Sequence, residues 1–148
     1  MNWICRTCGV EQAVAEQPPS ECAICTDERQ YVLPSGPAWT TSNELVDTGF
    51  GLRVDELERG RWGFTAEPKV GIGQTALLAR SAGGNLLFDV PPFVAPGALG
   101  LSVEWGGVGA IMASHPHCTA RRSRGAMPWG DVLVYVAQAH RAWVQRTD

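Results

Sequence analysis

Long apolar runs and secretion signals are both lacking in this chain of 148 residues. No stretch approaches the roughly 18 consecutive apolar residues of a membrane-spanning helix. The N-terminus, Met-Asn-Trp-Ile-Cys-Arg, has no basic region followed by an apolar block. We therefore expect a cytoplasmic protein without a membrane partner.

Charged residues are also scarce, and lysine is almost absent. Charged residues make up 18% of the chain, the formal net charge is −3, and Lys69 is the only lysine. The apolar share of 45% is typical of a globular protein. Residues 10–21 carry Glu11, Glu16 and Glu21 and no basic residue. Because phosphate contacts need basic side chains, we expect no nucleic-acid partner.

Four of the five cysteines form two Cys-x-x-Cys pairs, Cys5 with Cys8 and Cys22 with Cys25. In a chain without a secretion signal this spacing indicates metal before disulfides. Two such pairs place four thiolates tetrahedrally around Zn²⁺, and Gly9 allows the tight turn after the first pair. The sequence predicts a structural zinc ribbon over residues 1–30.

Two alternatives to zinc share this ligand set. A rubredoxin-like iron site uses the same four thiolates. Redox-active Cys-x-x-Cys pairs are disfavoured, since there are two pairs and no surrounding βαβ pattern. A segment this small cannot bury enough apolar surface to fold unaided, so the metal would supply its folding energy. Replacing Cys5 or Cys22 by Ser is then expected to unfold residues 1–30 and leave the rest folded.

Residues 31–62 carry a weaker pattern and are interpreted as an ordered linker. Thr41 or Ser42 can cap a short helix that has Glu44 in its first turn. Trp39 and Trp62 suggest that this segment packs against another part of the chain.

Residues 63–148 predict a mixed sheet with helices, an α/β unit. We expect a hairpin in which a strand from Gly73 turns at residues 82–85 and returns over residues 86–90. A helix over residues 95–104 and a buried strand from Val108 follow. A strand over residues 131–136 and a helix beginning at residues 137–144 complete the pattern.

The strand from Val108 leads into His115 and His117. In an extended segment these two side chains project to one side, so they can share one metal ion, a second zinc or another divalent cation. Asp89, at the end of the preceding strand, is a further candidate ligand or orienting group. Two surface histidines in a turn are the alternative interpretation.

This succession of elements resembles the N-terminal half of the metallo-β-lactamase fold, in which a strand leads into a His-x-His-x-Asp-His motif. The Cys-rich N-terminus, Asp27 to Tyr31, Trp39 to Thr41 and Ser114 to His117 are similar to a group of these hydrolases with a small N-terminal zinc ribbon. The resemblance implies a partial αββα unit, a small-molecule substrate and zinc-dependent hydrolysis, with His115 and His117 as ligands.

The sequence departs from that family's motif in two respects. Cys118, Thr119 and Ala120 follow His117, so the motif's Asp and third His are absent. The second half of the fold, which supplies further ligands, has no counterpart, and His140 is interpreted as a partly exposed helical side chain. We therefore expect an incomplete or weakly active hydrolase, with an exposed apolar face through which the chain self-associates. The alternative is a non-catalytic zinc-ribbon module that binds a protein partner on an α/β scaffold.

Overall fold

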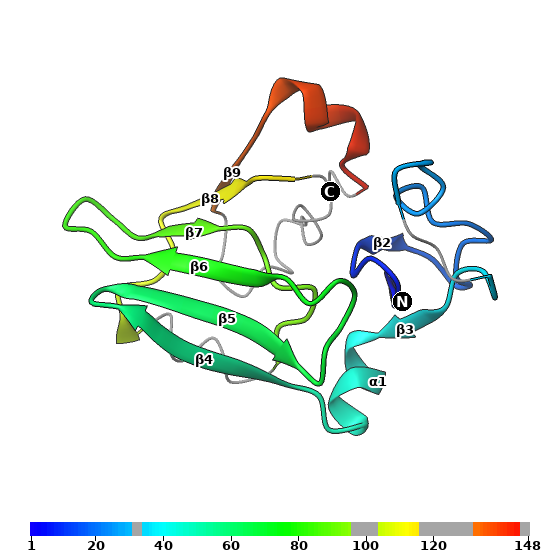
Figure 1. Cartoon of the computed structure of the whole chain (residues 1–148), viewed down its shortest axis with the longest axis horizontal. Coiled ribbons are helices and arrows are strands. Elements are labelled where there is room, and N and C mark those ends of the chain that lie inside the picture. The colour runs from blue at the N-terminus through cyan, green and yellow to red at the C-terminus, as the bar shows by residue number, and fades with distance from the viewer. Residues whose placement is uncertain (31–33, 96–103, 116–131, 146–148) are drawn as a thin grey trace.

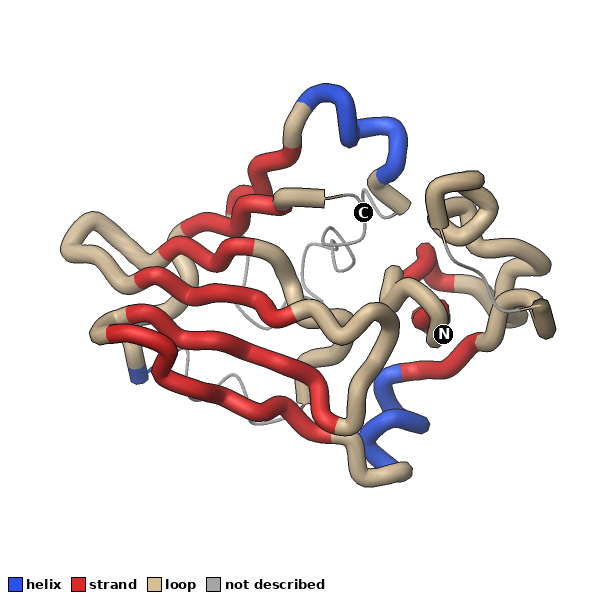
Figure 2. Tube along the Cα trace, in the orientation of Figure 1, coloured by secondary structure: helices blue, strands red, loops and turns tan. Residues whose placement is uncertain are grey.

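The computed structural model describes residues 1–30, 34–95, 104–115 and 132–145, and this part of the chain is mostly β-structure. Two sheets lie side by side, a small one near the N-terminus and a larger one (Figures 1 and 2). The small sheet has the order β2-β1-β3, with β1 at Asn2–Cys5, β2 at Glu11–Val14 and β3 at Trp39–Thr41. Both of its pairings are antiparallel.

The larger sheet contains six strands in sequence order from β4 to β9. They are β4 (Gly51–Glu58), β5 (Arg61–Glu67), β6 (Thr75–Ala79), β7 (Leu86–Phe88), β8 (Ala110–Ala113) and β9 (Leu133–Val136). The pairings from β4 to β7 are antiparallel, whereas β7, β8 and β9 are parallel. The carboxyl ends of the last three strands therefore meet at one edge. The predicted hairpin of β6 and β7 is confirmed.

The segment interpreted as a linker contains regular structure. Helix α1 (Ser42–Asp47) begins after Thr41, whose side chain accepts a hydrogen bond from the backbone of Glu44 in a capping box. This matches the expected cap. Strand β4 also lies in this segment and pairs with β5, so the larger sheet begins at Gly51 and not at Gly63. The sequence did not predict β4, because its charged residues resemble those of a solvent-exposed loop. Edge strands can carry such charges.

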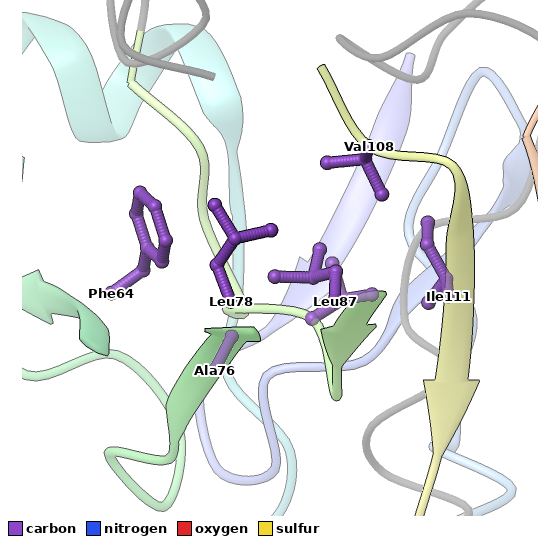
Figure 3. Packing of buried hydrophobic residues seen from close by; sticks show 7 residues of the cluster. Phe64, Ala76, Leu78, Leu87, Val108 and Ile111 are labelled. Carbon is purple, nitrogen blue, oxygen red and sulfur yellow. The ribbon is translucent and has the colours of Figure 1, made fainter. Parts of the chain in front are cut away.

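The inner face of the larger sheet holds the main apolar core. Phe64, Ala76, Leu78, Leu87 and Ile111 are buried together on four successive strands (Figure 3). Trp105 covers them, with its ring stacked on that of Trp62 at 4.3 Å between centroids. Because strand side chains alternate between faces, the residues between these core positions project from the opposite face.

That opposite face carries two rows of apolar side chains across four paired strands, which we call the outer rows. Strand register places one residue of each row on β6, β7, β8 and β9 in turn. Leu77, Met112, Leu133 and Tyr135 are exposed. The rows are Leu77, Phe88, Met112 and Tyr135, and beside it Ala79, Leu86, Ala110 and Leu133.

The described residues contain little helix, so the predicted α/β fold class is corrected to a mostly β fold. The predicted helix over residues 95–104 falls largely outside the described residues. The predicted helix from residue 137 is instead a 3₁₀ helix, η2 (Gln138–Trp143), without a side-chain N-cap. Strands β8 and β9, of four residues each, pair in parallel. The strand from Val108 was predicted to be buried, but β8 is buried on one face only, because Met112 is exposed on the other. In the described ranges no helix is both long and apolar enough to cross a membrane.

A separate buried cluster joins the two sheets. Ile4 of β1 and Leu45 of α1 pack with Ala66, Val70 and Phe93 from the larger sheet and its loops. Ile4 and Phe93 are fully buried. The predicted ribbon therefore shares a core with the rest of the chain, and burial of these side chains stabilises both sheets together.

Candidate metal centre and histidine cleft

The first cysteine pair sits on a tight turn at the end of β1. The backbone nitrogen of Gly9 donates to the carbonyl of Cys5 at 2.7 Å, and the backbone nitrogen of Cys5 donates to the carbonyl of Val10 at 3.0 Å. Gly9 has φ +80°, a conformation that favours glycine. The backbone N–H groups of Cys8 and Thr7 face the Cys5 sulfur and help to lower its pKa. This is the turn that the sequence predicted from Gly9.

The second pair lies on a helical turn, in which the backbone nitrogen of Thr26 donates to the carbonyl of Cys22 at 3.0 Å. The two turns bring all four cysteine sulfurs within 4.8 Å of one another. Cys5 lies 3.7 Å from Cys25, and Cys8 lies 3.6 Å from Cys22, measured between Sγ atoms. These distances exclude disulfides, whose sulfurs lie about 2.05 Å apart, and all four thiols are free and buried.

The four sulfurs fit a tetrahedral metal ion. Zinc–sulfur bonds of about 2.3 Å require sulfurs about 3.8 Å apart in a regular tetrahedron, close to the 3.6 and 3.7 Å observed. Of the described residues, these cysteines are the one group of three or more candidate ligands that could hold a metal. The arrangement is consistent with a structural zinc.

The electrostatics of the cluster favour a cation. Hydrogen bonds from Cys22 and Cys8 lower the pKa of Cys5. Hydrogen bonding with Cys22 and Cys5 raises the pKa of Cys8, and hydrogen bonding with Cys5 raises that of Cys22. Burial raises the pKa of Cys25 to about 12. Four adjacent thiolates are stable only when a metal ion offsets their charge, since each opposes ionisation of the next.

Asp89 links the carboxyl ends of β7 and β8. Its carboxylate accepts hydrogen bonds from the backbone nitrogen and the hydroxyl of Ser114, both at 2.8 Å. Asp89 is buried and has φ +65°, a left-handed conformation that Asp tolerates better than most residues and that recurs at functional sites. Both carboxylate oxygens therefore hold Ser114, directly before His115.

His115 opens into a cleft of about 400 Å³ between the cysteine ribbon and η2. The ribbon side contributes Ile24, Asp27, Arg29 and Gln30, and η2 contributes Ala139, His140 and Trp143. His117 and Cys118 lie outside the described residues, so the predicted pair of His115 with His117 is not described.

His140 lies in η2 and is partly exposed, as the sequence predicted, and it also lines this cleft. Its ring centroid lies 6.2 Å from that of His115, with the ring planes at 56°. The parallel pairing of Ala113 with Val136 directs the segments after β8 and β9 to the same sheet edge. The predicted strand before His140 could have indicated this approach. The inference would have required knowing that β8 and β9 pair in parallel.

The ribbon wall of the cleft is held by an ion pair. The Asp27 carboxylate accepts from Nε and Nη2 of Arg29 at 2.7 and 2.8 Å, and these hydrogen bonds lower the pKa of Asp27 to about 2. The Arg29 guanidinium lies 5.8 Å from the ring centre of Trp143 in η2. Trp143 also packs against the cysteine cluster. The ribbon and η2 are thus in direct contact beside the histidines.

Comparison with known proteins identifies a homologue. The chain is 34% identical to "Uncharacterized protein YmaE" of Bacillus subtilis (strain 168) over 148 residues, which cover 97% of this chain. It spans 53% of that relative's length. No protein-family model matches the chain, and no solved structure matches it.

Proposed function

We propose that the chain is a metal-dependent hydrolase of the metallo-β-lactamase type, with a structural zinc ribbon at its N-terminus. The observation that carries this proposal is the convergence of Asp89, Ser114 and His115 at the carboxyl ends of adjacent parallel strands. Ligands of layered α/β proteins gather at such strand ends. The cleft beside His115 is large enough for a small-molecule substrate.

Zinc in the ribbon would be held by Cys5, Cys8, Cys22 and Cys25, with no coordination position left open for substrate. A second zinc or other divalent ion at His115 would polarise a scissile carbonyl or phosphoryl group and activate water. Asp89 would fix the backbone before His115 through Ser114. His117 belongs to this site by the resemblance alone.

Weak activity is part of the proposal. Thr119 and Ala120 stand where the family motif has Asp and His, so the ligands of one metal are missing. The matched Bacillus subtilis protein is nearly twice as long as the matched region, and we propose that the remaining half completes the metal shell in that relative. The cytoplasm, where zinc thiolates persist, remains the proposed location.

An assay panel tests the hydrolase. Lactam, thioester, lactone and phosphodiester substrates are incubated with the chain and added Zn²⁺. The proposal predicts slow, zinc-dependent turnover of one class that His115→Ala abolishes and Arg141→Gln retains, because Arg141 is exposed on η2 and does not line the cleft. Turnover by His115→Ala equal to that of the original chain rejects the proposal, as does no turnover of any class.

The second candidate is a protein-binding module without catalysis, and the outer rows favour it. Met112 and Tyr135 are 42% and 54% exposed, and all eight side chains of the rows are uncharged. A second copy of this chain is the occupant we propose, because two neutral apolar faces do not repel each other. A chain that self-associates through these rows and hydrolyses no substrate would fit this candidate.

A further inference from the structure

We propose that His115 and His140 together bind one divalent transition-metal ion at the mouth of the cleft. This inference deepens the proposed hydrolase site and rests on the proposed function only for its chemistry, since metal binding can be measured without a substrate. The pair differs from the sequence prediction, which joined His115 to His117.

The two rings lie near the separation that a shared ion requires. A metal–nitrogen bond of about 2.1 Å places the metal about 3.2 Å from the centre of each imidazole. Two rings on one tetrahedral zinc then have centres about 5.2 Å apart, and rings on opposite sides of an ion have centres about 6.4 Å apart. The observed separation is 6.2 Å, with the ring planes tilted by 56°. We infer that side-chain rotation brings the rings about 1 Å closer when zinc binds.

Hydrogen bonds fix the backbone at or next to both histidines. His115 directly follows Ser114, which Asp89 holds through two hydrogen bonds. His140 lies within η2, where its backbone nitrogen donates to Ala137 at 2.9 Å. Trp143 of the same helix packs on the cysteine cluster. Preorganised ligands bind metal more tightly than ligands on free segments.

The rest of the cleft leaves room for solvent or substrate at the ion. Both oxygens of Asp27 are hydrogen-bonded to Arg29, so this carboxylate serves the cleft wall and is not a ligand. Two imidazoles leave coordination positions open for water or substrate, and this pair has one protein ligand fewer than the usual catalytic zinc site, which agrees with the weak activity proposed. His115 is exposed and His140 half-buried, so the ion can enter from solvent.

Variants of the two paired histidines and a control variant on the same helix test the inference. Protein with its ribbon zinc in place is treated with a mild chelator and then dialysed to equilibrium against Zn²⁺ alone, and zinc bound beyond the ribbon ion is counted. We expect His115→Gln and His140→Gln to lower the affinity of this second zinc by roughly tenfold or more. Arg141→Gln should bind it as the original chain does, because Arg141 is exposed on η2 and does not line the cleft. His140→Asp, which restores a ligand atom, should recover binding.

Binding by His140→Gln equal to that of the original chain overturns the inference, and so does the absence of a second zinc in the original chain. Thermal unfolding of each variant checks that the fold is kept, and His140→Asp provides a second reading if His140→Gln is unstable. Zinc binding through His140 without hydrolysis would leave this inference standing and reject the hydrolase. Zinc-dependent hydrolysis that His140→Gln does not change would support the hydrolase and reject this inference.

Discussion

Gly71 lies directly against Gly9, so that a Cβ atom on Gly71 would come within 2.7 Å of the Gly9 backbone nitrogen. Gly71 belongs to the loop between β5 and β6, and Gly9 closes the first cysteine turn. A Cβ atom on Gly9 would in turn meet Cβ of Pro92 at 2.6 Å. The cysteine turn therefore packs closely against two loops of the larger sheet. The absence of a Cβ atom at Gly9 and at Gly71 permits these contacts.

Gly71→Ala should destabilise the fold and loosen the ribbon metal. Its φ of +59° and the backbone contact are both unfavourable for alanine, which predicts a loss of about 1–3 kcal/mol in the free energy of unfolding. Gly60→Ala is the matched control, since Gly60 has φ +76° and a Cβ atom there would meet nothing within 4 Å. Denaturant titration and the rate of zinc transfer to a chelator measure both effects. Equal zinc transfer in the two variants would contradict the contact argument.

Cys22→Ser should weaken the whole chain and not residues 1–30 alone. The sequence suggested that the rest of the chain would stay folded, but Ile4 and Phe93 share one buried cluster. Loss of the metal then removes support from both sheets, and we expect the Tm to fall by roughly 10 °C or more. Hydrogen exchange measured peptide by peptide shows which parts of the chain are destabilised. Unchanged protection of β5 and β6 would show that the ribbon unfolds independently.

Metal affinity should fall as the pH is lowered. The raised pKa values of Cys8, Cys22 and Cys25 keep these thiols protonated near neutral pH when no cation is bound. Zinc must displace those protons, so acid favours the metal-free form and alkali the bound form. Calorimetry at pH 7 in buffers of different ionisation enthalpy should give roughly three to four protons released per zinc. Release of one proton or none would contradict the thiolate site.

Self-association through the outer rows is tested by one charge. Met112→Glu places a carboxylate in the centre of the rows and should shift the chain toward the monomer in light scattering. Val46→Glu is the control, because Val46 has similar exposure, 40% against 42% for Met112, but lies on α1. A monomer at every concentration, without binding of a hydrophobic dye, would argue against an association surface.

Local signals predicted much of what the structure describes. The cysteine spacing, the capping residue Thr41 and the turn before Asn85 each depend on neighbouring residues, and each was found where expected. Strand β4 was missed because Arg53, Asp55 and Glu56 resemble a solvated segment until β5 pairs with them. An edge strand is recognised from its pairing with the neighbouring strand more than from its own sequence pattern.

The neighbours of His115 could not be predicted for a different reason. The approach of His140 follows from the parallel register of β8 and β9, a contact between segments distant in sequence. The sequence placed Asp89 at a strand end near His115, as a candidate ligand or orienting group. Its actual partner, Ser114, requires the parallel pairing of β7 and β8.

Metal content per chain, determined on protein purified without added metal, tests the ribbon most directly. We predict one tightly held zinc and no zinc in the Cys22→Ser variant. In the folded protein the four cysteines should be unreactive toward thiol reagents: Cys5, Cys8, Cys22 and Cys25. Iron in place of zinc would retain the four-thiolate centre but reject the zinc assignment. A folded chain that contains neither metal, and whose four thiols react freely, would contradict it.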